Sequence, residues 1–138
     1  MDRDVVSAKL ETLRRCVQRV KEKTPATAKS LSDDYDLQDI ICLNLERAIQ
    51  VSVDLASHAI ADADLPAPTS MSESFEHLFR LGLIPADLAL RMRKAVGFRN
   101  VAVHAYQQIN WTMVYSIITT RLDDFRAFAD AVARAARL

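Results

Sequence analysis

The chain has 138 residues, of which 50% are hydrophobic and 26% charged, and its formal net charge is zero. This length is typical of one domain and the composition suffices for a packed core, so we expect a single domain over residues 1–138. A neutral balance argues against a protein that is basic throughout, as many nucleic-acid binders are. Glycines (two) and prolines (four) are few, and with helix formers abundant this favours an all-α fold.

Targeting and cysteine patterns narrow the class of protein further. No apolar run reaches the roughly 18 residues that a membrane-spanning helix needs. The first four residues, MDRD, lack the basic-then-apolar order of a secretory signal. Cys16 and Cys42, the two cysteines, lack the spacing of a metal or redox site and predict buried thiols. We therefore expect a cytoplasmic protein without a membrane segment, a metal or a cofactor.

The N-terminal half predicts two long helices separated by a loop. The first runs from about residue 4 to 23 and ends before Pro25, because the residue that precedes a proline is disfavoured in a helix. Residues 24–33 predict a loop, and Ser32 or Asp33 would cap a second helix that extends to about residue 63. That helix is apolar over much of its circumference, so it must be covered on several sides. Burial inside the bundle would cover part of it, and a partner subunit could cover the rest. The apolar residues of the first helix follow steps of four and three: Val6, Leu10, Leu13, Val17 and Val20.

The C-terminal half predicts one short helix and two longer ones. Ser70 and Glu73 have the spacing of a capping box, which predicts a helix over residues 71–81, and Gly82 suits the left-handed position after it. Pro85 suits the first turn of the next helix. Asn110 would cap a last helix, in which apolar residues recur at steps of four and three over residues 111–136. Without any strand pattern, we expect an antiparallel up-and-down bundle of about five helices. Three residues of the short helix should face inward: Phe75, Leu78 and Phe79.

Polar residues that suit phosphate chemistry gather just after Gly97. Arg99, Asn100, His104 and Tyr106 lie within eight positions. An arginine offers phosphate a planar fork of donors, and a histidine titrates near neutral pH, so it can act as acid or base. Residues 1–90 hold 10 Lys+Arg against 15 Asp+Glu, whereas residues 91–138 hold 8 against 3. The positive excess thus surrounds these residues, although ordinary helix-face charge explains the same asymmetry.

The order Arg99, four residues, His104, one residue, Tyr106 resembles the R-x4-H-x-Y signature of the HepT-like toxins, small helical ribonucleases of the HEPN superfamily. The runs VGFRNVAVHAYQQIN, ERAIQVSVDLASHAIA and LPAPTSMSESFEHLFRLGLIP resemble that family in order and spacing, so the resemblance covers about residues 5–130. It implies a HEPN-like fold and a toxin that cleaves RNA as a homodimer, with the active site at the interface. It also implies an antitoxin, a minimal nucleotidyltransferase (MNT), which attaches AMP to Tyr106 and can form a larger complex with the toxin.

The residue types fit cleavage of RNA without a metal ion. The neighbouring 2′-hydroxyl attacks the phosphorus, which requires a base for the nucleophile and an acid for the leaving oxygen. His104 is the candidate acid and base, Arg99 the candidate phosphate ligand, and Asn100 could orient either of them. AMP on Tyr106 would compete with RNA phosphate for Arg99 and block the cleft.

The spacing of these residues raises a geometric question. On a regular helix Arg99 and Tyr106 share a face, while His104 lies about 140° from Arg99. Either Gly97 interrupts the helix so that Arg99 swings round, or the residues of two chains meet across a dimer axis, and we expect some of each. A two-fold homodimer would supply two arginines and two histidines to one cleft.

Other features are explained more simply by structure than by function. We interpret His58 and His77 as structural histidines. The acidic residues at 33–36 indicate the start of a helix rather than a cation site. The main alternative function is a non-catalytic helical module that binds a nucleotidyltransferase and grips nucleotide phosphate. A structural dimer with a decayed site is a third interpretation.

Overall fold

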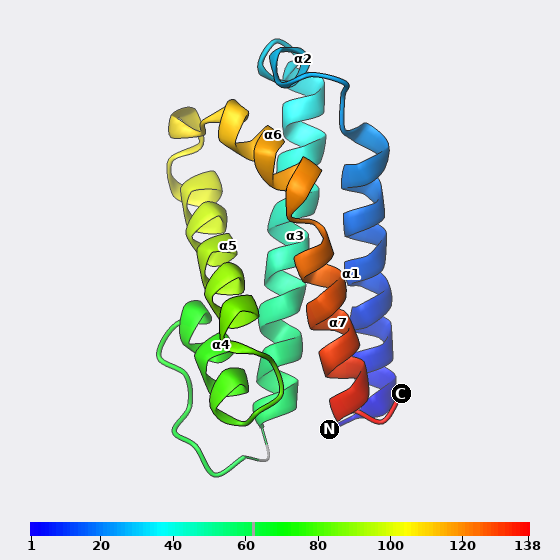
Figure 1. The fold of residues 1–138 in the computed structure, drawn as a ribbon, viewed down its shortest axis with the longest axis vertical. Coiled ribbons are helices and arrows are strands. Elements are labelled where there is room, and N and C mark those ends of the chain that lie inside the picture. The colour runs from blue at the N-terminus through cyan, green and yellow to red at the C-terminus, as the bar shows by residue number, and fades with distance from the viewer. Residues whose placement is uncertain (62) are drawn as a thin grey trace.

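The computed structural model describes residues 1–61 and 63–138, and Figure 1 shows a bundle built from helices. Helices account for all the regular structure in this part of the chain, which confirms the all-α prediction. The prediction of about five helices is an undercount, since the described residues form seven α-helices and one short 3₁₀ helix. In chain order these are α1 (Arg3–Lys23), α2 (Ala28–Ser32), α3 (Tyr35–Ile60), α4 (Met71–Arg80), α5 (Ala86–His104), η1 (Tyr106–Gln108), α6 (Trp111–Thr120) and α7 (Asp123–Ala135).

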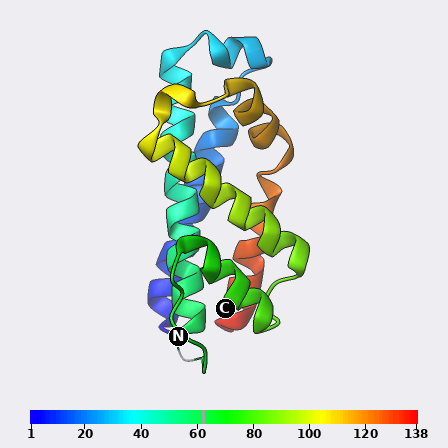
Figure 2. The same cartoon turned by 90° about the vertical axis from the view of Figure 1, so that its left-hand side faces the viewer.

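Helix α3 is the centre of the bundle. It packs against α1, α2, α4, α5 and α7, which confirms that a helix with so wide an apolar surface is covered on several sides. Ile41, Leu45 and Ile49 on α3 are almost completely buried. One strip of α3 stays open to solvent, and it includes Asp39 and Leu43. Figure 2 shows α5 crossing α3 obliquely, so that the C-terminal end of α5 lies over the N-terminal half of α3.

The two chain ends meet at one end of the bundle. The Arg3 guanidinium donates a hydrogen bond to the Arg137 carbonyl at 2.8 Å. Figure 1 shows both ends at the bottom of the bundle, while the C-terminal end of α5 lies near the top.

Several helix boundaries follow from the local chemistry of the sequence. The Ser70 hydroxyl accepts a hydrogen bond from the Glu73 amide at 3.2 Å, and the Asn110 side chain accepts one from the Met113 amide at 3.1 Å, so both predicted caps are confirmed. Gly82 has a φ of 74° after α4, in the left-handed region that favours glycine. The cap of α3 is Asp34 rather than Ser32 or Asp33.

Two predictions about the N-terminal and middle regions were wrong. Residues 24–33 are not a plain loop, because Thr27 caps the short helix α2 and Leu31 inserts into the core with 0% exposure. The Gln38 side chain then donates to the carbonyls of Leu31 and Ser32, which fixes α2 on α3. Phe79 is 41% exposed rather than inward, because it lies at the edge of the face of α4 that Ser74, Phe75, His77 and Leu78 bury. The predicted extension of α3 towards residue 63 includes position 62, which lies outside the described residues.

The predicted single helix over residues 111–136 is two helices. The Thr119 and Thr120 hydroxyls donate back to the carbonyls of Tyr115 and Ser116, contacts that compete with a regular helical path. Helix α7 then starts afresh with two acidic residues in its first turn. Figure 1 shows α6 crossing the top of the bundle and α7 lying along α1. The apolar period continues across the break because Leu122, between the two helices, is buried.

Candidate functional site

The candidate residues lie on α5 and in the short segment after it. Helix α5 continues through Gly97 to His104 without interruption, so the predicted break at Gly97 is wrong. The helix ends at Ala105, whose backbone has φ −146° and ψ 50°. Arg99 and His104 therefore lie on one regular helix and point about 140° apart. Tyr106 lies in η1, beyond the end of the helix, so the prediction that it shares a helical face with Arg99 is also wrong.

Arg99 lies between α5 and α3 and is half-buried. Its Nη2 donates to the Gln50 side-chain oxygen at 3.5 Å, and its Nη1 donates to the Asn100 side-chain oxygen at 3.4 Å. The Gln50 amide nitrogen donates to Asp54 at 3.1 Å, and Asp54 pairs with Lys9 of α1 at 3.5 Å. A chain of polar contacts thus joins three helices and orients Arg99, while the rest of its five N–H donors remain available for phosphate.

His104 is the last residue of α5, and its side chain is exposed. No hydrogen bond or ion pair to the rest of the described chain occupies its imidazole. Both ring nitrogens are therefore open to a ligand from outside this chain.

Tyr106 is held against α3 by its hydroxyl group. The hydroxyl donates to Asp39 Oδ1 at 2.9 Å, and the ring meets Trp111 edge-on, with 5.8 Å between the ring centroids. The side chain stays 38% exposed. Partial burial, the hydrogen bond to Asp39 and the nearby Cys42 and Glu46 raise the pKa of the Tyr106 phenol. The phenol therefore keeps its proton at neutral pH.

Helix α3 aligns the contacts of Arg99 and Tyr106. Asp39 and Gln50 are eleven residues apart, which places them on one face of α3, about 16 Å apart along its axis. Glu46 lies between them on the same face. The contact of Tyr106 with Asp39 joins residues 67 positions apart in sequence, and that of Arg99 with Gln50 joins residues 49 positions apart. Neither Asp39 nor Gln50 was predicted as a site residue from the sequence, in which their shared helical period was the one available signal.

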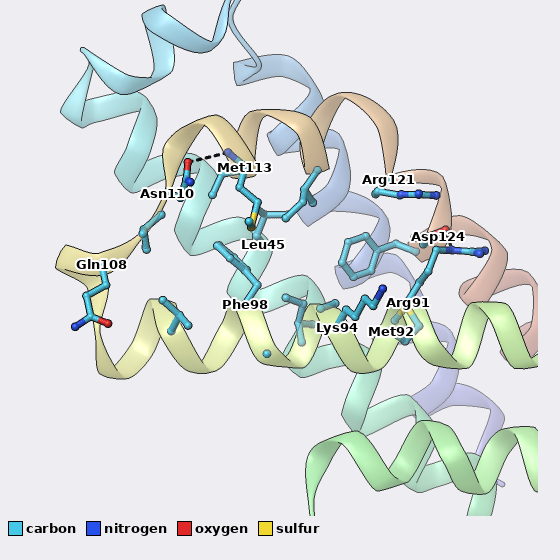
Figure 3. A pocket seen from close by; sticks show the side chains of 18 residues that line it. Leu45, Arg91, Met92, Lys94, Phe98, Gln108, Asn110, Met113, Arg121 and Asp124 are labelled. Carbon is cyan, nitrogen blue, oxygen red and sulfur yellow. Dashed lines mark hydrogen bonds and ion pairs between the residues drawn. The ribbon is translucent and has the colours of Figure 1, made fainter.

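A separate pocket of about 540 Å³ lies along α5, and Gly97 is among its lining residues. Figure 3 shows Phe98, Leu45 and Met113 reaching into it, with Arg91, Lys94 and Arg121 towards one end. Arg91 is already paired with Asp124 at 2.8 Å. The pocket is mostly apolar, and its lining does not include Arg99, His104 or Tyr106.

His77, the acidic residues before α3 and the two cysteines have structural roles or buried positions. His77 is 1% exposed and contacts Glu73 at 3.1 Å. Asp33 pairs with Lys29, which together with the Asp34 cap accounts for the acidic run at the start of α3. Cys16 and Cys42 are free thiols, and both are buried, as predicted. Burial and the charge of Glu46 raise the pKa of Cys42 to about 12, so this thiol is unreactive at neutral pH.

The described residues offer neither a metal centre nor a bilayer-spanning helix. Among them, no group of three or more His, Cys, Asp or Glu side chains converges as a metal site would require. Within the same residues, no helix has the length and apolar content needed to cross a bilayer.

A helical bundle with an arginine and a histidine on one helix, and a tyrosine just after that helix, is the arrangement expected of a protein of the HEPN superfamily. The model of the family described as "Ribonuclease HepT-like" matches residues 13–132. The chain is 33% identical over 129 residues to the mRNA nuclease HepT of Shewanella oneidensis, and the match covers 94% of this chain and 96% of that relative. The chain therefore belongs to the HepT-like ribonuclease family.

Two solved structures are similar over nearly their whole length. One is a chain of a toxin–antitoxin crystal structure with AMP-PNP, which matches with a TM-score of 0.89 and 32% identity over 95% of this chain and 98% of that chain. The other is from a tri-AMPylated Shewanella oneidensis HEPN toxin in complex with an MNT antitoxin. It matches with a TM-score of 0.89 and 33% identity over 97% of this chain and 99% of that chain.

Proposed function

We propose that this protein is the toxin of a toxin–antitoxin pair and cleaves RNA without a metal ion. Arg99 binds the scissile phosphate and stabilises its developing charge, and His104 moves the protons. Asn100 supports Arg99 through the contact at 3.4 Å. The observation that carries the proposal is an exposed, unoccupied His104 at the end of the helix that also carries an oriented Arg99, in a chain 33% identical to an mRNA nuclease.

The uninterrupted path of α5 supports a homodimer as the active form. In a straight helix Arg99 and His104 diverge by about 140°, so one chain presents them poorly to a single phosphate. Two chains related by a two-fold axis offer the arginine of one and the histidine of the other to the same groove. The continuous path of α5 through Gly97 supports this pairing as the way an arginine and a histidine reach one groove.

We further propose that an MNT antitoxin neutralises the toxin by attaching AMP to Tyr106. A similar solved structure is a tri-AMPylated HEPN toxin with its MNT antitoxin, and the Tyr106 side chain is 38% exposed. A nucleotide there adds negative charge and bulk on the face of α3 that Arg99 also contacts, where its phosphate would compete with RNA for the arginine. Toxin and antitoxin would act in the cytoplasm, where RNA and nucleoside triphosphates are present, as a dimer or a larger complex.

Cleavage of RNA by purified variants tests the enzyme proposal. Wild-type protein should cut RNA in the presence of a chelator, and His104→Ala should abolish the cleavage. His58→Ala is the matched control, because His58 lies on α3 away from the candidate residues and should keep full activity. Equal cleavage by wild type and His104→Ala would show a contaminating nuclease and overturn the proposal.

A non-catalytic module that holds a nucleotidyltransferase is the second candidate function. The observation that favours it is the pair of acidic residues Asp39 and Glu46 on the strip of α3 next to the motif, because carboxylates repel RNA phosphate. Expression of the chain alone separates the two functions. It should arrest growth if the protein is a toxin and be harmless if it is a binding module.

A further inference from the structure

We propose that Asp39 of this chain is the general base for the modification of its own Tyr106. The toxin would then carry part of the machinery for its neutralisation, and the nucleotidyltransferase would supply the nucleotide. This inference rests on the proposed attachment of AMP to Tyr106.

The geometry of the pair is that of a base and its proton donor. Asp39 Oδ1 accepts the Tyr106 hydroxyl at 2.9 Å, within the range of about 2.6–3.2 Å over which a general base can take a proton. Within the described chain, this is the one hydrogen bond of the Asp39 side chain, and no ion pair engages it. The edge-on contact with Trp111 holds the tyrosine ring in this orientation. Both residues are exposed, so a nucleotide can approach the hydroxyl oxygen.

The reaction gives Asp39 a defined task. The Tyr106 oxygen forms a bond to the α-phosphorus of a nucleoside triphosphate, and the bond from that phosphorus to the pyrophosphate oxygen breaks. Pyrophosphate leaves with the electron pair, and the hydroxyl proton passes to Asp39 and then to water. Protein kinases use an aspartate in the same way, to accept the proton of the substrate hydroxyl.

The surroundings of Tyr106 make a proton acceptor necessary. Burial and the nearby carboxylates keep the pKa of the phenol above its ordinary value, so free phenolate is scarce at neutral pH. A hydroxyl of this kind becomes a good nucleophile when its proton is removed as the new bond forms. Asp39 is the carboxylate in position to do so.

RNA cleavage gives no reason for a carboxylate at this position. Asp39 and Glu46 place negative charge on the strip of α3 that faces the motif, where they oppose the binding of RNA phosphate. Modification also changes the contact with Asp39 itself. Once the Tyr106 oxygen is bonded to phosphorus it has no proton to donate, so the hydrogen bond that holds η1 to α3 is lost.

The test measures transfer of AMP to purified variants by the cognate nucleotidyltransferase and ATP. The readout is the initial rate of the gain in intact mass, about 329 Da for each AMP. Asp39→Asn keeps an oxygen that can accept the hydrogen bond but is not a base, so the rate should fall about 100-fold or more. Asp39→Glu restores a carboxylate and should recover part of the rate. Asp36→Asn is the control, one turn away on α3, and should react as wild type does.

A tyrosine analogue with a more acidic phenol distinguishes two roles for Asp39, as a general base or as a group that only positions Tyr106. Incorporation of a fluorinated tyrosine at position 106 makes the phenol more acidic, so the reaction depends less on a base. The difference in rate between the protein with its native Asp39 and the Asp39→Asn variant should then shrink. If Asp39 only holds the ring in place, the difference stays the same, and the proposal is overturned.

Two further outcomes keep this inference apart from the proposed function. If Asp39→Asn is modified at the wild-type rate, Asp39 is not the base, while Tyr106 remains the acceptor. If Tyr106→Phe still gains AMP, the acceptor is another residue and the proposed neutralisation falls with it. Thermal unfolding and binding to the nucleotidyltransferase, measured on Asp39→Asn, should match wild type and so exclude loss of the fold or of the complex.

Discussion

Replacing each glycine by alanine gives a test of the proposed dimer. Gly97 lies in the middle of α5, in helical conformation, and a methyl group added there would meet nothing within 4 Å beyond its own turn of the helix. Nothing within one chain therefore requires a glycine. Gly97 shares an exposed face of α5 with His104, seven residues further on. If two α5 helices meet on this face, glycine is where they approach most closely.

The expected changes in free energy have opposite signs for the single chain and for the dimer. Alanine is favoured over glycine in a helix by about 1 kcal/mol, so Gly97→Ala should stabilise the isolated fold by about that amount. At a packed interface an added methyl group costs about 1–3 kcal/mol, which corresponds to a dimer about 5- to 150-fold weaker. RNA cleavage at low protein concentration should fall in proportion. Gly82→Ala should behave in the reverse way, because φ is 74° there, and lose about 1–2 kcal/mol of fold stability without weakening the dimer.

Three measurements check this pair of substitutions. Denaturant unfolding gives the stability of the fold, analytical ultracentrifugation gives the dimer dissociation constant, and cleavage of RNA gives the activity. If Gly97→Ala leaves both the dimer and the cleavage unchanged, this face of α5 is not the interface and the shared groove is refuted. If it destabilises the chain at concentrations where the protein is monomeric, the open surroundings of Gly97 are refuted.

Three other predictions concern the core, the thiols and the orientation of Arg99. Phe75 and Phe128 are both 0% exposed and stack edge-on at 5.5 Å, so Phe128→Ala should cost about 3–5 kcal/mol in urea unfolding; a loss below about 1 kcal/mol would contradict the packing. Cys42 has its pKa raised from 9.0 to about 12, so at pH 9 it should react with iodoacetamide at least about 100-fold more slowly in the folded than in the unfolded protein. The same raised pKa favours the native state below pH 9, and this contribution should be lost as the pH rises towards 12. Gln50→Leu removes the acceptor of Arg99 and should lower kcat/KM for RNA about fivefold, or about 1 kcal/mol, whereas Gln107→Leu, on the exposed 3₁₀ helix, should change nothing.

Features that depend on neighbours in sequence were predictable. Ser70 caps α4 and Asn110 caps α6 because a side-chain oxygen needs only the amide three residues later. The break between α6 and α7 was not predictable from the apolar period. Leu122 lies between the two helices and is buried, so the apolar period continues through the change in direction. The hydroxyls of Thr119 and Thr120 were a signal for it.

In the candidate site, too, some features were predictable from the sequence and others were not. The residues Arg99, Asn100, His104 and Tyr106 were identifiable from their spacing, but their partners were not. Tyr106 meets Asp39 across 67 positions, a contact that exists only once α5 crosses α3. The end of α5 at His104, which leaves Tyr106 outside the helix, was not predictable from the spacing of the motif either.

The junction of Arg3 with Arg137 has a practical use. Since both ends emerge together at the end of the bundle remote from the C-terminus of α5, an affinity tag or fluorescent protein can be fused to either one without covering the motif. The same closeness makes a circular permutant feasible, with a short linker joining the old ends and new ones opened in an exposed connection.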